Sequence, residues 1–176
     1  MNYANIKYTD IANGPGVRTS LFVSGCTHHC RECFNPETWD FAFGEPYDSE
    51  VEEALLSSLE PAYINGLSIL GGEPMEPANQ EALLPLYRKF KERFPGKTLW
   101  IYSGYCFEQL TDPGYKRAYT AFTSEILQLA DVLVDGEFVA EKKNISLRFR
   151  GSENQRIIDL RETLKTGSIV LSDYSS

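Results

Sequence analysis

The stretch Leu67-Ser68-Ile69-Leu70-Gly71-Gly72-Glu73-Pro74 joins a short apolar run to a turn of glycine and polar residues. Short apolar runs bounded by turn signals are typical of strands buried on both faces. Three further runs have the same character: Thr19–Ser24, Thr98–Tyr102 and Val132–Val134. Each of them also ends at cysteine, glycine or polar residues: Gly25-Cys26, Ser103-Gly104-Tyr105 and Asp135-Gly136-Glu137.

The segments between these strands are helical in pattern, so strand and helix alternate along the chain. Helices are expected from the capping-box pair Ser49 and Glu52 to Leu59, and from about Ser124 to Ala130. The alternation predicts an α/β fold with a mostly parallel sheet. A complete eightfold barrel needs roughly 250 residues, so 176 residues predict a partial, open (β/α) barrel. Because ligands lie at the carboxyl ends of parallel strands, the four polar strand ends predict a single site.

A longer helix is expected between the strands Leu67–Leu70 and Thr98–Tyr102. It ends at Pro95-Gly96, and Pro85 inside it predicts a kink or a later start. Its apolar stripe, spaced by three and four residues, consists of Leu83, Tyr87, Phe90 and Phe94.

Composition narrows the class of protein. The formal net charge is −8 and the pI is near 4.8, which disfavours a general nucleic-acid binder, because phosphate contacts supply most non-specific affinity. The first residues resemble no secretion signal, and no apolar run is long enough to span a bilayer. We therefore expect a cytoplasmic protein that is not bound to a membrane. No repeat or linker interrupts it, which predicts a single domain over residues 1–176, although the tail after about Leu160 carries no motif.

Three of the four cysteines lie in the run Cys26-Thr27-His28-His29-Cys30-Arg31-Glu32-Cys33, a C-x₃-C-x₂-C pattern on a loop. Without a secretion signal, such a cluster indicates metal binding rather than disulfides. Thiolates are the ligands of iron–sulfur clusters, and three of them leave one iron of a four-iron cube open. A structural zinc site that recruits His28 or His29 is the alternative, and buried or redox thiols are another. Cys106, far along the chain, is interpreted as a small buried hydrophobe, with a minor role in the site left open.

The cysteine run followed by Phe34 resembles the signature of the radical S-adenosylmethionine (SAM) superfamily. The resemblance implies that Cys26, Cys30 and Cys33 hold a [4Fe–4S] cluster whose open iron binds SAM, with Phe34 near the adenine and Glu32 on the cofactor loop. Gly71-Gly72-Glu73-Pro74 is similar to the GGEP motif of that superfamily, in which glycines let the backbone approach a ligand and a carboxylate can accept from an ammonium group. Ser103, which offers a hydroxyl for the ribose, and Asp135 complete the expected cofactor contacts.

A longer resemblance points to a subgroup, the activating proteins of anaerobic ribonucleoside-triphosphate reductase. Asn13-Gly14-Pro15-Gly16-Val17-Arg18 is similar to the lead-in of glycyl-radical-enzyme activases, although asparagine replaces the more common aspartate. The other similar segments are Cys33–Trp39, Trp100–Tyr105, Asp131–Phe138 and Arg148–Arg156.

The resemblance implies a function and partners. A flavodoxin or ferredoxin would reduce the cluster, reductive cleavage of SAM would give a 5′-deoxyadenosyl radical, and this would remove a hydrogen from a glycine of the reductase. No side chain is needed as acid or base. An activase for pyruvate formate-lyase, a synthase of modified bases, and a non-catalytic zinc or electron-transfer module are the alternatives. The nearby cations Arg148, Arg150 and Arg156 fit a solvated, ion-paired face as well as a partner-binding or SAM-proximal role.

Overall fold

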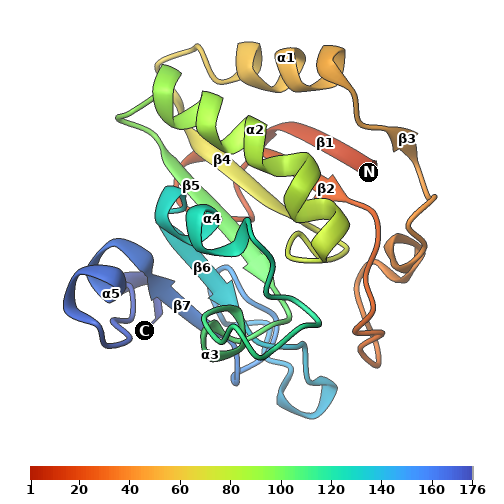
Figure 1. Ribbon diagram of the computed structural model, residues 1–176, viewed down its shortest axis with the longest axis vertical. Coiled ribbons are helices and arrows are strands. Elements are labelled where there is room, and N and C mark those ends of the chain that lie inside the picture. The colour runs from red at the N-terminus through yellow and green to blue at the C-terminus, as the bar shows by residue number, and fades with distance from the viewer. Residues whose placement is uncertain (176) are drawn as a thin grey trace.

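Residues 1–175, described by a computed structural model, form one sheet of seven strands in the order β3-β1-β2-β4-β5-β6-β7 (Figure 1). The strands that run parallel to one another are β2 (Val17–Val23), β4 (Ile64–Gly71), β5 (Thr98–Ser103) and β6 (Val132–Asp135). The antiparallel strands are β1 (Asn2–Asp10), β3 (Glu45–Pro46) and β7 (Arg156–Asp159). All four strands expected from apolar runs are confirmed, each within a few residues.

The prediction of a mostly parallel sheet is wrong, because β1, β3 and β7 each pair with a neighbour in the antiparallel direction. The sheet is mixed and not closed, and its edge strands are β3 and β7. The partial barrel is therefore not confirmed. The physical reason is that an antiparallel strand can leave one face in water. Most of β1 is exposed or half-buried, and so its sequence contains no apolar run.

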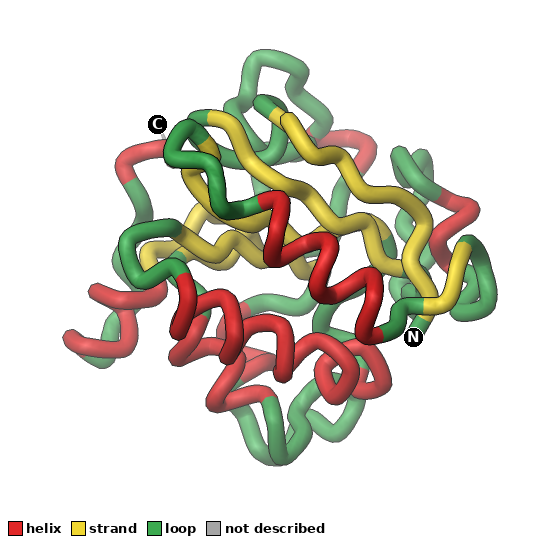
Figure 2. The backbone as a smooth tube through the Cα atoms, turned by 90° about the horizontal axis from the view of Figure 1, so that it is seen from above, coloured by secondary structure: helices red, strands yellow, loops and turns green. Residues whose placement is uncertain are grey.

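One face of the sheet is covered by α1 (Ser49–Ser58), α2 (Pro77–Arg93) and α4 (Thr123–Leu129), and the longer helices lie together on one side of the strands in Figure 2. Shorter elements are α3 (Phe107–Leu110), α5 (Leu160–Thr166), and the 3₁₀ turns η1 (Pro36–Trp39), η2 (Ala140–Lys142) and η3 (Asp173–Ser175). No helix in the part of the chain that the structure describes is long and apolar enough to cross a membrane.

The helices correct two expectations and confirm a third. Asp48 caps α1, because its side chain accepts from the Val51 N–H at 2.9 Å. The predicted capping box at Ser49 and Glu52 is wrong, since aspartate is as good a cap as serine and comes one residue earlier. The α2 helix begins at Pro77, so the late start is wrong; proline suits the first turn of a helix. The α4 helix begins and ends within one residue of its predicted bounds.

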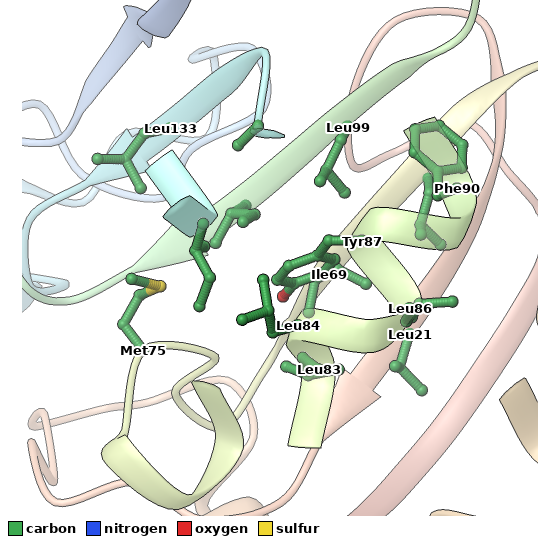
Figure 3. Packing of buried hydrophobic residues seen from close by; sticks show 14 of the residues in the cluster. Leu21, Ile69, Met75, Leu83, Leu84, Leu86, Tyr87, Phe90, Leu99 and Leu133 are labelled. Atoms are coloured by element: carbon green, nitrogen blue, oxygen red, sulfur yellow. The ribbon is translucent and has the colours of Figure 1, made fainter. Parts of the chain in front are cut away.

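Side chains that alternate along the central strands divide the protein into two sides. Leu21, Ile69, Leu99 and Leu133 point to the helical side. They belong to one core cluster with residues of α2, among them Leu83, Tyr87 and Phe90 (Figure 3). Burial of each such side chain contributes about 1.5–3 kcal/mol. The residues between them face the other side. In the strand register they form one row across the sheet: Phe22, Leu70, Tyr102 and Val134.

Candidate functional site

A cavity of about 620 Å³ lies on the face of the sheet that the helices leave open. The row Phe22, Leu70, Tyr102 and Val134 forms its floor. The cavity is also lined by residues at or just after the carboxyl ends of the parallel strands: Cys26, Gly72, Glu73, Ser103, Gly104 and Gly136. The four strand ends therefore meet at one cavity, as the sequence predicts. Cavities of about 300–1,000 Å³ are typical of small-molecule sites.

The three clustered cysteines lie on a loop that is attached to the end of the sheet. The Gly25 N–H donates to Thr38 O at 2.7 Å and the Cys26 N–H to Trp39 O at 3.3 Å, so the loop closes on η1. Two non-glycine residues in it, His29 and Glu32, have φ of 52° and 59°. Such left-handed backbone is costly and persists where the surroundings hold it, often at functional sites.

All three thiols of this loop line the cavity. The pKa of Cys26 is raised to about 12, mainly by burial and to a smaller extent by the nearby carboxylates of Glu73 and Glu76. Burial likewise raises the pKa of Cys30 above its usual range. Thiols of this kind ionise when a positively charged metal group binds them.

The donors around the loop fit an iron–sulfur cluster better than a Cys₃His zinc site. His28 has both ring nitrogens within hydrogen-bond distance of carboxylates, of Glu73 at 2.9 Å and Glu137 at 2.7 Å. The His29 ring stacks on Trp39 with centroids 4.4 Å apart. The fourth cysteine, Cys106, does not line the cavity. The residues described therefore bring three thiols, and not four, to this site.

The two glycines of the GGEP turn pack directly against the start of the cysteine loop. The Gly72 N–H donates to Val23 O at 2.7 Å and the Glu73 N–H to Gly25 O at 2.8 Å. A Cβ on Gly71 would lie 2.6 Å from Val23 N, and one on Gly72 would lie 2.7 Å from Gly25 O. Only glycine allows this close approach, so the turn after β4 fixes the start of the cysteine loop.

Glu73 is buried and its carboxylate accepts from several donors of the protein. Oε1 accepts from the Ser103 hydroxyl at 3.0 Å and the Gly104 N–H at 2.6 Å, and Oε2 accepts from the Met75 N–H at 2.8 Å. With His28 as a fourth contact, the orientation of this carboxylate is fixed at the cavity wall.

The structure brings most of the expected cofactor residues together. Lining the cavity are Cys33, Phe34, Gly71, Gly72, Glu73 and Ser103. Glu32 and Pro74 do not line it. Asp135 is buried and directed elsewhere: it accepts from Arg156 at 2.9 and 2.5 Å and from the Phe107 N–H at 2.7 Å. Asp135 therefore holds the turn after β6, and its contact with a cofactor stays a prediction.

The three arginines of the segment 148–156 have different surroundings. Arg156 pairs with Glu108 as well as Asp135, so the ion-paired interpretation fits it. Arg150 lines the cavity and donates to Gln155 O at 3.0 Å. The Arg148 guanidinium stacks on Phe149.

Sequence reasoning missed several residues of the site. The sequence indicates His28 only as a possible zinc ligand, although its place between two cysteines puts it in the loop. Glu76, two residues after the GGEP motif, accepts from the Thr27 N–H at 2.8 Å and from its hydroxyl at 2.7 Å. Phe149 and Gln155 also line the cavity; they belong to the similar segment Arg148–Arg156, of which only the arginines were given a possible role.

Comparison with known proteins agrees with this geometry. A family model described as a 4Fe-4S single cluster domain matches residues 12–158. A protein of Pasteurella multocida is 42% identical over 159 residues, which are 89% of this chain and 96% of the relative. One of Escherichia coli K12 is 38% identical over 163 residues, 92% of this chain and 100% of the relative. One of Enterobacteria phage T4 is 38% identical over 159 residues, 89% and 93% of the two chains.

All three relatives carry the same name. The identity is well above the level at which only a fold is shared, and the match covers nearly the whole of each protein. The resemblance that begins at the cysteine loop thus extends over the sheet and its strand ends. The chain belongs to the family of anaerobic ribonucleoside-triphosphate reductase-activating proteins.

Proposed function

We propose that this chain is a radical SAM enzyme that generates a glycyl radical on an anaerobic ribonucleotide reductase. The observation that carries the proposal is a cavity lined by three cysteines of one loop, with the fourth cysteine outside it. The names of the relatives supply the target, because those proteins are reductase-activating proteins.

Cys26, Cys30 and Cys33 would hold a [4Fe–4S] cluster and leave one iron for the amino and carboxylate groups of SAM. When bound, this cluster would supply the electron for reductive cleavage of SAM to methionine and a 5′-deoxyadenosyl radical, and this radical would take a hydrogen atom from a glycine of the reductase. The electron would come from a donor protein of the flavodoxin or ferredoxin class.

The side chains of the protein would bind, orient and exclude water. The bonds from Ser103 and Gly104 fix the Glu73 carboxylate at the cavity wall, where it would face the ammonium group of SAM. Phe34, which is 61% exposed at the cavity, would lie against the adenine. The apolar floor formed by Phe22, Leu70, Tyr102 and Val134 would keep water from a reactive radical. No acid or base is assigned.

The test is anaerobic reconstitution with iron and sulfide, followed by addition of SAM and dithionite. We expect an EPR signal of a reduced cluster that changes when SAM binds, and 5′-deoxyadenosine as a product. Cys26→Ala should lose iron and product together. Cys106→Ser is the matched control, because Cys106 lies outside the cavity, and it should retain both.

Two outcomes would overturn the proposal. Zinc at one ion per chain in colourless protein, with no 5′-deoxyadenosine, would indicate a structural metal module. Cleavage of SAM without a glycyl radical on the anaerobic ribonucleotide reductase, when pyruvate formate-lyase is activated, would reassign the target.

A further inference from the structure

The C-terminal segment, residues 169–175, lies beyond the region that the family model matches and packs beside the cavity. The family model matches residues 12–158. After α5 the chain returns along β7. The Asp159 N–H donates to Val170 O at 2.9 Å, and the Ser172 N–H donates to Ile157 O at 2.8 Å. In Figure 1 the C-terminus accordingly lies beside β7 and α5.

Tyr174 completes an aromatic cluster behind the cavity wall. Its ring centroid lies 5.8 Å from that of Trp100 and 5.7 Å from that of Phe149, and the latter two rings are 5.5 Å apart. All three pairs meet edge to face, a favourable arrangement of aromatic rings. Trp100 belongs to β5 and is 1% exposed, whereas Phe149 lines the cavity. Tyr174 therefore packs against both a residue of the central sheet and a residue of the cavity wall.

The residues on either side of Phe149 contact the same segment. Nη2 of Arg150 donates to Ser175 O at 2.8 Å. The Arg148 guanidinium lies 5.3 Å from the Tyr174 ring centroid. Two residues of the wall, Phe149 and Arg150, thus contact the C-terminal segment, as does the neighbouring Arg148.

The backbone conformation of Phe149 needs surrounding contacts to hold it, and the C-terminal segment supplies some of them. The φ of Phe149 is 59°, a left-handed conformation that bulky side chains rarely adopt. Such a conformation persists only when surrounding contacts hold it. Gly151, two residues further on, also lines the cavity, so release of Phe149 would move more than its own side chain.

We propose that residues 169–175 act as a positioning element for the cavity, in which Tyr174 and Ser175 hold Phe149 and Arg150 in the geometry that binds the ligand. The inference rests on the proposed function, because it takes the cavity as the SAM site. Tyr174 is not among the residues that line the cavity. It is a positioning residue that acts through Phe149.

The experiment compares Tyr174→Ala, Tyr174→Phe and the control Tyr63→Ala, which removes a tyrosine that is 65% exposed and does not line the cavity. Hydrogen–deuterium exchange is measured for residues 147–151 and, as a reference, for α2. Steady-state cleavage of SAM with dithionite is measured on the reconstituted variants. Tyr174→Phe keeps the ring and should match the unaltered protein.

Tyr174→Ala should speed exchange at residues 147–151 while α2 stays protected. It should raise the KM for SAM about two- to tenfold, the range that corresponds to one aromatic contact, with a smaller change in kcat. Unchanged exchange and KM would overturn the proposal, as would equal loss of protection in α2 or an equal effect of Tyr63→Ala. If the unaltered protein did not cleave SAM, the proposed function would fail, whereas the exchange result would still report on the wall.

Discussion

His28 Nε2 lies 2.9 Å from Oε1 of Glu73, so the middle of the cysteine loop is joined to the turn after β4. The other ring nitrogen lies 2.7 Å from Glu137, which follows β6. The ring also packs against Tyr105 with centroids 4.3 Å apart, and a Cβ on Gly104 would stand 2.7 Å from it. One imidazole thus contacts the ends of three parallel strands.

Replacement of His28 by alanine should loosen the cysteine loop. The change removes a ring that contacts two carboxylates, one of them the buried Glu73, so we expect the free energy of unfolding to fall by about 1–3 kcal/mol. Less iron should be retained after anaerobic reconstitution. Denaturant unfolding and the iron content per chain measure these effects. His29→Asn is the matched control, because asparagine tolerates the left-handed backbone at this position. Equal losses in the two variants would contradict the role of the bridge.

Gly72→Ala should destabilise the junction between the cysteine loop and β4. The added Cβ would lie 2.7 Å from Gly25 O and 2.9 Å from Thr38 O, both backbone atoms that cannot move aside cheaply. Overpacking of this kind costs about 1–3 kcal/mol, which thermal or denaturant unfolding measures. Gly96→Ala, where the added Cβ would meet nothing within 4 Å, should change stability little. If Gly72→Ala left the free energy of unfolding unchanged, the cysteine loop would be free to shift away from the added Cβ.

The part of the fold that sequence predicts is the part in which both faces of a strand are buried. Such strands need continuous apolar runs, and all four runs became β2, β4, β5 and β6. Because glycine, cysteine and carboxylate residues follow these runs, the location of the cavity could also be inferred. The three clustered cysteines could be assigned to one site from sequence alone, because they lie within eight residues of one another.

The rest depends on contacts between distant segments. β1 pairs with β2 through its backbone, and its half-exposed side chains show no apolar run. Asp135 stands at the end of β6, where a cofactor residue would lie, yet its carboxylate accepts hydrogen bonds from Arg156 of β7. Tyr174 approaches Trp100 only because the chain turns back after α5. Local sequence patterns carry no information about these partners.

The pairing of Glu108 with Arg156 should make a small contribution to stability that depends on pH. Arg156 donates to both oxygens of Glu108, at 3.0 and 2.7 Å, and this holds the pKa of Glu108 below its usual value of 4.5. A lowered pKa stabilises the folded state above the usual value, and this stabilisation is lost as the pH falls through the lowered one.

The contribution of this ion pair to stability is limited by the exposure of Glu108 to solvent. The Glu108 side chain is 60% exposed, so solvent screening limits it to about 0.2–1 kcal/mol. Glu108→Gln should lower stability at neutral pH and much less in acid, as measured by urea unfolding. Glu81→Gln, which alters an exposed carboxylate of α2, is the control. A difference between Glu108→Gln and the unaltered protein that stayed constant from neutral to acidic pH would contradict the assignment.

Tyr87→Phe should stabilise the protein, although it removes a polar group from the core. Tyr87 is fully buried on α2 (Figure 3), and its hydroxyl has no hydrogen-bond partner within residues 1–175. A buried hydroxyl without a partner carries a desolvation cost of about 1–3 kcal/mol, part of which the variant should recover. Tyr47→Phe is the matched control, because the Tyr47 hydroxyl donates to Glu52 at 3.3 Å, so its loss should destabilise the fold. Denaturant unfolding of both variants decides the sign, and a destabilised Tyr87→Phe would show that the hydroxyl is bound by a buried water.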